Sequence, residues 1–281
     1  MKLIFKPIKK ITKKILGKKN NNLINVISLC GVIGKDSKID SGINFNNCYT
    51  IIKKAFEHSE VKAVAISVNS PGGSPVQSEL IYNFIREMSE AKKIPVYTFA
   101  QDLSASGGYW LLLAGDEIYA HNSSIVGSIG VIFSSFGLVE VIKKLGIERR
   151  IYTEGKNKAI LDPFLPEVEE NISILKSVQK DIYQHFVELV KSRRQNKLKV
   201  NDEQIFTGAF WSGKTAKELG LIDEIADLRA KMQEKFGNDV EFNYISPKKS
   251  FLKNFFSEKT NIASKIVYEL EEKISFNKFG L

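Results

Sequence analysis

The sequence predicts an α/β protein in which parallel strands alternate with helices. Residues 63–68 form a run rich in β-branched residues, and a turn with two glycines at 69–74 follows it. Residues 95–100 form a second β-branched and aromatic run, and a turn of small residues at 102–108 leads into the apolar stretch 109–114. Short apolar runs of this kind are typical of buried strands, and the patterns after each turn are typical of helices. Two such units in succession favour parallel strands whose loops meet at one edge of the sheet, where open α/β sheets bind ligands.

The first 22 residues are predicted to be a basic amphipathic tail and linker. Eight lysines and no acidic residue precede residue 20. A lysine-rich helix with one apolar stripe suits an anionic membrane surface, and the alternative is a solvated, disordered tail. The stripe recurs at intervals of four, three and four residues and consists of Ile4, Ile8, Ile11 and Ile15.

The main domain is expected to span residues 23–246. Strands are predicted where short apolar runs end at turn residues, and helices where apolar residues recur at spacings of three and four. Beyond the two units above, we expect strands at 23–33, 117–120 and 148–153, and helices at 46–58, 76–88, 136–145 and 167–194. A C-terminal amphipathic helical extension, residues 247–281, is either a second membrane-surface helix or a contact between subunits.

Composition excludes several classes of protein. A chain of 281 residues that is 43% apolar can bury one large α/β domain with appendages. The formal charge is +9, but subtracting the eight lysines of the tail leaves +1, so no nucleic-acid partner is expected. Cys30 and Cys48 fall in segments predicted to be core or core edge, as buried thiols. The three histidines lack metal-ligand spacing, and we expect no metal and no cofactor.

No segment is predicted to cross a membrane. No apolar run approaches the ~20 residues that a membrane-spanning helix requires. The first residues also lack the continuous apolar region and the cleavage site of a secretory signal. With no signal peptide or transmembrane helix evident, the sequence predicts a cytoplasmic protein or one bound peripherally to the inner membrane.

The turn at 102–108 is a suitable place for a nucleophilic serine. A hydroxyl between a strand and a helix meets unpaired N–H groups and the positive end of the helix dipole. The alternative is that Ser104, Ser106 and the glycines only cap the helix and allow close packing. Ser104 is the rival nucleophile, although it lacks flanking glycines. The turn does not match the Gly-x-Ser-x-Gly elbow of α/β-hydrolases.

Four motifs follow one another along the chain. They are Ser70-Pro71-Gly72-Gly73, Ser104-Ala105-Ser106-Gly107-Gly108-Tyr109, Gly127-Ser128-Ile129-Gly130-Val131 and the segment 155–164. In this order they resemble the signal peptide peptidase A family, of the protease IV type. The resemblance implies a Clp/crotonase-like fold, a spiral of strand-strand-helix units. It also implies a serine endopeptidase with a Ser/Lys dyad that degrades short hydrophobic peptides, such as cleaved signal peptides, at the membrane.

The same resemblance assigns roles to five residues. Ser106 would be the nucleophile and Lys158 its base. Ser128 would orient the lysine, and the backbone N–H groups of Gly73 and Gly107 would form the oxyanion hole. A lysine acts as a base only when it is neutral, so burial must lower its pKa by roughly 2–4 units from about 10.4. Lys156 falls on a variable position of the motif, and His121 is disfavoured as the base because no carboxylate obviously orients it.

The resemblance also implies an assembly. In short family members the serine and the lysine come from adjacent subunits of a dome-shaped ring, so we expect a homo-oligomer, either a tetramer or an octamer. The other expected partners are peptide substrates and, through the N-terminal tail, an anionic membrane surface.

Two alternatives remain open at the level of sequence. A crotonase-type acyl-CoA hydratase or isomerase shares the fold but needs a carboxylate base near the second turn. A catalytically inactive, membrane-associated scaffold would keep the fold without the chemistry.

Overall fold

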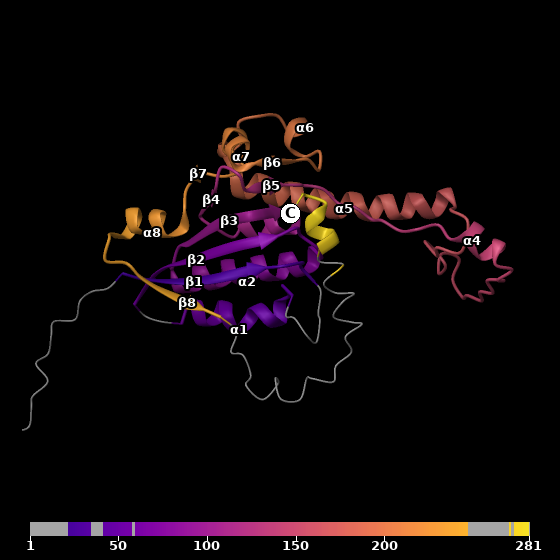
Figure 1. Ribbon diagram of the computed structural model, residues 1–281, viewed down its shortest axis with the longest axis horizontal. Coiled ribbons are helices and arrows are strands. Elements are labelled where there is room, and N and C mark those ends of the chain that lie inside the picture. Colours follow the sequence, from indigo (N-terminus) through magenta and orange to yellow (C-terminus); the bar gives the residue numbers. More distant parts are fainter. Residues whose placement is uncertain (1–21, 35–41, 58–59, 247–269, 271–272, 281) are drawn as a thin grey trace, which may run out of the picture.

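The computed structural model describes residues 22–34, 42–57, 60–246, 270 and 273–280. The predicted tail up to residue 21 and most of the predicted C-terminal extension lie outside these residues. Figure 1 shows a body of sheet and helices from which one long part of the chain extends.

The body is built on a mostly parallel sheet whose central strands are those predicted from the sequence. β1 (Leu23–Cys30), β2 (Val61–Ser70) and β3 (Val96–Ala105) run parallel and are neighbours in that order. β8 (Glu241–Ile245) adds a parallel strand beside β1, so that the last described strand lies next to the first. The expected α/β class is therefore confirmed.

The sheet divides along β3, because the two halves of this strand pair with different neighbours. The first half of β3 pairs with β4 (Glu117–Ala120), while its last residues pair with β5 (Ile125–Gly127). β4 continues to β7 (Glu224–Ile225), and β5 pairs antiparallel with β6 (Phe210–Ser212). The carboxyl end of β3 is consequently held between β2 and β5, whose loops approach it from both sides.

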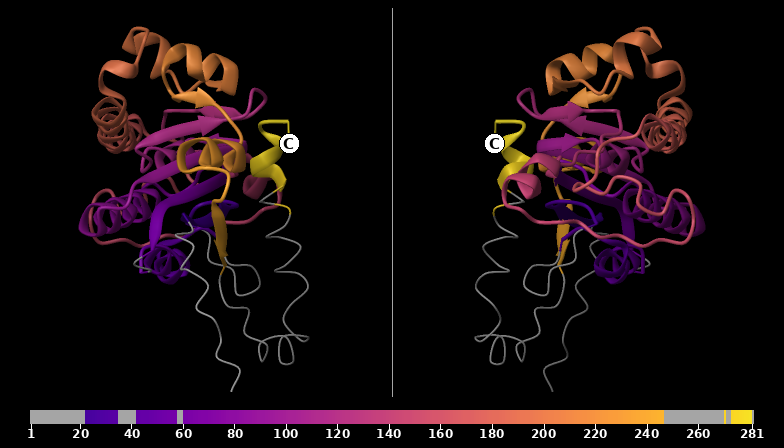
Figure 2. Two further views of the ribbon diagram at one scale, coloured as in Figure 1. Left: turned by 90° about the vertical axis from the view of Figure 1, so that its left-hand side faces the viewer. Right: turned by 90° about the vertical axis from the view of Figure 1, so that its right-hand side faces the viewer.

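Helices cover both faces of the sheet. α1 (Phe45–Ala55), α2 (Pro75–Lys92) and α3 (Gly107–Leu112) contribute to the larger core, and α8 (Leu228–Phe236) packs on the opposite face. Figure 2 shows α2 and α5 on one side of the sheet. Fully buried residues of α2 such as Ile81 each contribute about 1.5–3 kcal/mol through the apolar area removed from water.

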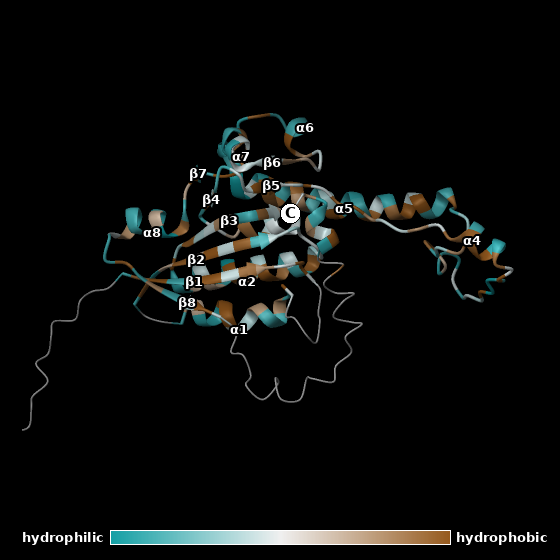
Figure 3. Ribbon diagram, viewed as in Figure 1, coloured by the Kyte–Doolittle hydropathy of each residue, from teal (hydrophilic) through white to brown (hydrophobic). Residues whose placement is uncertain are grey.

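A second part of the chain, which we call the arm (residues 133–174), leaves this body. It comprises an irregular segment, the short helix α4 (Val139–Lys144), a long turn region and the start of α5 (Glu169–Arg194). α4 has no buried residue, and the buried residues of α5 all belong to its second half. Figure 1 shows α4 at the far end of the molecule from β1 and α8, and Figure 3 shows hydrophobic residues along this extension.

Three local predictions were wrong. The strand expected at 148–153 is irregular, because the chain there has left the sheet and no described strand lies beside it to accept its hydrogen bonds. The helix expected at 136–145 is limited to α4.

The two cysteines differ in burial. Cys48 is buried as expected, and burial raises the pKa of its thiol to about 12. The third wrong prediction concerns Cys30, which is exposed because it is the last residue of β1 and faces outward.

The second half of α5 is fixed to the body by a buried ion pair. Arg194 is 1% exposed and donates to both carboxylate oxygens of Asp223 and to the carbonyl of Gly220. Asp223 also pairs with Lys197 at 2.8 Å and accepts a hydrogen bond from the N–H of Ile118. Burial alone would raise the pKa of Asp223, but the hydrogen bonds and charge of Arg194, with Lys197 and Ile118, outweigh it and hold the pKa below its ordinary value.

Three further elements complete the upper layer in Figure 1, and a short helical segment at 273–277 lies below them, beside the sheet. They are the 3-10 turn Gln195–Lys197, α6 (Asp202–Ile205) and α7 (Gly213–Leu219). Within the described ranges, none of the helices has the length and apolar character needed to span a bilayer.

Candidate active site

The turn between β3 and α3 holds Ser106 in an unusual backbone conformation. Its φ is 54° and its ψ is −120°, a combination that residues other than glycine rarely adopt and that costs about 1–3 kcal/mol. The Ser106 N–H donates to the carbonyl of Gly127 at 2.7 Å, and the Ser106 carbonyl accepts the first hydrogen bond of α3 from Trp110. The neighbouring strand and helix therefore hold the strain in place.

The side chain of Ser106 does not cap the helix. No hydrogen bond joins its hydroxyl to the first turn of α3, although Ser106 occupies the N-cap position. The residue is half-buried, so the hydroxyl remains accessible. The purely structural interpretation of this serine, as a helix cap, is wrong.

Ser104 has a different environment. It is fully buried, and its hydroxyl donates to the carbonyl of Val68 at 3.0 Å. A substrate cannot reach it, so the structure excludes the rival nucleophile.

Two glycines of the preceding loop bring backbone close to Ser106. A Cβ placed on Gly72 would lie 2.8 Å from both the amide nitrogen of Gly107 and the Cβ of Ser106. A Cβ placed on Gly73, whose φ is 145°, would lie 2.0 Å from the carbonyl oxygen of Ile33. Neither position tolerates a side chain without a shift of the backbone, which explains the Pro-Gly-Gly sequence at the end of β2.

Two backbone N–H groups near the serine have no acceptor within the described part of the chain. The loop is pinned through its neighbours, since Ile33 donates to Gly72 and Ser74 donates to Ile33, which leaves the N–H of Gly73 unpaired. The N–H of Gly107, at the first position of α3, is likewise unpaired. Free N–H groups at a helix start are suited to binding a negatively charged oxygen.

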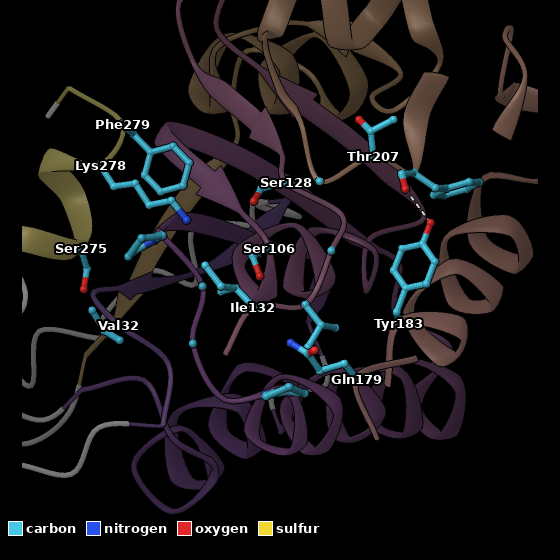
Figure 4. A pocket seen from close by; sticks show the side chains of 18 of the residues that line it. Val32, Ser106, Ser128, Ile132, Gln179, Tyr183, Thr207, Ser275, Lys278 and Phe279 are labelled. Carbon is cyan, nitrogen blue, oxygen red and sulfur yellow. Dashed lines mark hydrogen bonds between the residues drawn. The ribbon is translucent and has the colours of Figure 1, made fainter. Parts of the chain in front are cut away.

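A cavity of about 800 Å³ opens over this turn. Figure 4 shows Ser106 and Ser128 near its middle and Ile132, Gln179 and Tyr183 around them. Apolar side chains from four separate segments form much of its wall: Val32, Val131, Ile132, Phe206 and Phe279. Its size is that of a pocket for a small ligand or a few residues of a peptide.

Ser128 reaches the same cavity from the loop after β5. Its φ is 55°, and its N–H donates to the carbonyl of Ala209 at 2.7 Å. The structure therefore brings Ser106, Ser128 and Gly73 to one cavity, with Gly107 directly behind Gly72.

Lys158 does not join them within one chain. It lies in the arm, in a turn where its N–H donates to the carbonyl of Gly155, and its side chain is exposed and does not line the cavity. Lys156, two residues earlier, pairs with Glu170 at 2.8 Å, whereas Lys158 has no ion-pair partner among the described residues.

Among the described residues, the cavity wall contains neither a histidine nor a carboxylate. His121 is exposed elsewhere, and His185 contacts Glu79 at 3.2 Å and the ring of Trp110. No Asp or Glu of the described residues lines the cavity, which removes the carboxylate base that a crotonase-type reaction needs. The described residues also contain no cluster of side chains suited to a metal ion.

Sequence reasoning missed the contribution of α5 to the cavity. Four of its residues line the wall: Lys176, Gln179, Lys180 and Tyr183. Their spacing of three, one and three residues places them on one face of the helix. This spacing is the one feature of the sequence that could have pointed to them. Tyr183 also donates to the carbonyl of Phe206 at 2.5 Å, which fixes the opposite loop.

Comparison with known proteins agrees with the motifs. The family model of peptidase family S49 matches residues 88–237. A putative signal peptide peptidase SppA of Enterococcus faecium is 33% identical over 79% of this chain and 65% of that protein. Protease 4 of Haemophilus influenzae is 33% identical over 73% of this chain and 33% of that protein.

Two further similarities have different names. A protein of Brucella abortus named Na(+)/H(+) antiporter NhaA is 50% identical over 72% of this chain, but the match spans only 27% of that protein. A solved membrane-bound stomatin-specific protease is 16% identical, with a TM-score of 0.49, over 81% of this chain and 99% of that one. The chain thus spans about a quarter of the length of the first curated relatives it matches. With the S49 model matching more than half of its residues, the chain belongs to peptidase family S49.

Proposed function

We propose that this protein is a serine peptidase in which Ser106 is the nucleophile. The observation that carries the proposal is the strained, uncapped Ser106 at the start of α3, half-buried in a cavity and next to two unpaired N–H groups. A backbone conformation of this kind is maintained only where the surroundings impose it, and such strain concentrates at functional sites.

Gly73 and Gly107 form the oxyanion hole in this proposal. When the serine oxygen bonds to the scissile carbonyl carbon, negative charge develops on the carbonyl oxygen. Neither N–H group has an acceptor among the described residues, so both are available to bind that oxygen. Removal of one such donor typically lowers turnover by ~10²–10³-fold.

Lys158 is the base, and it comes from a neighbouring copy of the chain. Its amine takes the proton of the Ser106 hydroxyl as the oxygen bonds to the carbonyl carbon, and it returns that proton to the leaving amine as the C–N bond breaks. Water then hydrolyses the acyl-enzyme by the same route in reverse. In the isolated chain the Lys158 side chain is exposed, so docking of the arm must bury the amine to keep it neutral. Ser128 hydrogen-bonds that amine and orients it.

The surface of the arm supports an assembly of this kind. Large apolar side chains are exposed along it and have no core to join within one chain. Several large exposed apolar side chains on one part of a chain favour an interface, and a head-to-tail arrangement of copies forms a ring when its rotation closes. The exposed set comprises Phe133, Phe136, Val141, Leu145, Ile147, Ile151, Tyr152, Val168 and Ile174. We propose a tetrameric or octameric ring in which each arm completes the site of the next subunit.

The proposed substrates are short peptides with hydrophobic residues, such as cleaved signal peptides. The wall is largely apolar, and segments 71–73 and 128–132 present backbone outside the sheet along two sides of the cavity. A peptide bound there as an added strand would use main-chain hydrogen bonds for affinity and the wall for side-chain preference. The basic tail at residues 1–22 would hold the assembly at an anionic membrane surface, where such peptides are released.

A fluorophosphonate label and a peptide ester test the proposal together. We expect the label on Ser106, and we expect Ser106→Ala and Lys158→Ala each to lower hydrolysis by about 10⁴-fold or more, as loss of a nucleophile or its base does in other serine peptidases. Lys156→Ala is the matched control, since it removes a neighbouring lysine whose amine already pairs with Glu170. Labelling of another residue, or full activity of Lys158→Ala, would contradict the proposal.

A further inference from the structure

The cavity wall contains positive charge and no described negative charge. Lys176 and Lys180 line it from α5, and Lys278 lines it from the turn at 278–280, which follows a short helical segment at 273–277. Figure 4 shows Lys278 on the other side of Ser106 from Tyr183 of α5. The nearest acidic neighbour on the helix, Asp181, is not among the residues that line the cavity.

The two lysines of α5 differ from other basic residues of the same helix. Near its end, Lys191 pairs with Asp202 and Arg194 with Asp223. Lys176 and Lys180 are exposed and have no ion-pair partner among the described residues. One helical turn separates them, so both amines extend from the same face of the helix, beside Gln179.

A cavity with this lining suits a ligand that is apolar with one anionic end. The apolar wall favours hydrophobic side chains, while two unpaired ammonium groups at the edge favour a negative charge. A cleft lined by charge of one sign also concentrates ligands of the opposite sign. In a peptide, the available anion is a carboxylate.

We propose that Lys176 and Lys180 are specificity residues that bind a carboxylate of the peptide substrate, and this proposal rests on the peptidase function above. The carboxylate is either that of an acidic side chain or that of the free C-terminus. Peptides that combine hydrophobic residues with one such group are then preferred over fully neutral ones.

Binding is measured first, so that the result does not depend on catalysis. Three fluorescent peptides share one hydrophobic sequence: one neutral with an amidated end, one with an internal Glu and an amidated end, and one neutral with a free carboxylate. Their affinities for full-length Ser106→Ala protein are compared by anisotropy at low and high salt. We expect the carboxylate-bearing peptides to bind about tenfold more tightly at low salt, and the peptide with the larger gain identifies the source of the carboxylate.

Substitution of the lysines then tests their role. Lys176→Gln and Lys180→Gln should each lower the preference about threefold, and the double variant should abolish it with little change for the neutral peptide. The double change to Glu should reverse the preference toward a peptide bearing Lys. Lys217→Glu on α7 is the control for the double Gln variant, because both change the net charge by two and Lys217 is exposed outside the cavity wall.

The outcomes separate this inference from the proposed function. Equal binding of all three peptides, or an unchanged preference in the double Gln variant, overturns the role of the lysines even where Ser106-dependent hydrolysis is observed. Absence of fluorophosphonate labelling at Ser106 overturns the peptidase function, while a carboxylate preference abolished in the double Gln variant would still assign the binding role.

Discussion

The body and the arm are built on opposite principles. In the body, strands and helices bury a common core, and the packing is tight enough to hold Ser106 in a strained conformation. In the arm, α4 buries nothing and large apolar side chains face outward. The body by itself holds the proposed nucleophile in place, whereas the arm exposes apolar residues that no other described part of the same chain buries. In the proposed assembly the site is divided, with the nucleophile Ser106 held in each body and its base Lys158 carried on each arm.

Substitution of a glycine should give the largest difference in activity between the two regions. Gly73→Ala in the body would force a Cβ to within 2.0 Å of the Ile33 carbonyl oxygen, whereas Gly146→Ala in the arm would meet nothing within 4 Å. Both residues have positive φ, so both variants lose about 1 kcal/mol from the backbone conformation alone. Only Gly73→Ala should also lower kcat, by about 10²–10³-fold, because it displaces an oxyanion donor. Peptide-ester kinetics with both proteins check this, and equal kcat values would contradict it.

Substitution of an apolar residue should lower stability when the residue lies in the body and weaken assembly when it lies in the arm. Ile81→Ala removes a fully buried side chain of the body and should lower the free energy of unfolding by about 2–5 kcal/mol without dissociating the assembly. Phe136→Ser changes a side chain that is 83% exposed in one chain, and it should weaken assembly by about tenfold or more through loss of a buried contact between subunits.

Denaturation and sedimentation velocity distinguish these effects. A Phe136→Ser protein that assembles like the wild type would show that the arm is not the interface. Dissociation of the Ile81→Ala protein under conditions where it remains folded would show that body and arm are not independent.

The ion pair that joins α5 to the body gives a smaller, pH-dependent effect. The pKa of Asp223 is lowered in the folded state, so its contribution to stability is complete above the unfolded pKa of about 3.9 and is lost as the pH falls through the lower folded value. Asp223→Asn should therefore reduce the slope of stability against pH in this acidic range, by at most about 1.4 kcal/mol per pH unit.

Urea denaturation at several pH values below 5 measures this slope. Asp181→Asn is the control, since it removes an exposed carboxylate of the same helix and should change stability at neutral pH by less than about 0.5 kcal/mol. An acidic slope as steep in Asp223→Asn as in the wild type would contradict the assignment.

Sequence predicted the body better than the arm, for a physical reason. The strand–turn–helix units at β2–α2 and β3–α3 follow from local patterns, since β-branched runs and glycine turns specify their own conformations. The strand expected at 148–153 has the right residue types, but a strand also needs a neighbour, and no local pattern reveals that the chain has left the sheet.

The candidate site also has residues that the sequence predicted and residues whose position it did not predict. The sequence motifs singled out Ser106, Ser128 and Gly73, and the fold brings these three residues to one cavity. The exposed position of Lys158 on the arm depends on the path of the whole chain, which no motif encodes. Beyond their helical spacing, Lys176 and Lys180 are not distinguished in a chain with 41 lysines and arginines, because the cavity and the absence of an ion-pair partner are features of the fold.

Mixed assemblies test the divided site most directly. Subunits carrying Ser106→Ala and subunits carrying Lys158→Ala are co-expressed with different tags, and complexes that contain both are isolated and assayed on a peptide ester. Each variant alone is expected to be inactive, while the mixed assembly should recover up to about a quarter of the wild-type rate, since random head-to-tail pairing places an intact serine beside an intact lysine in about one site of four. Mixed complexes of verified composition that remain inactive would contradict a site shared between subunits.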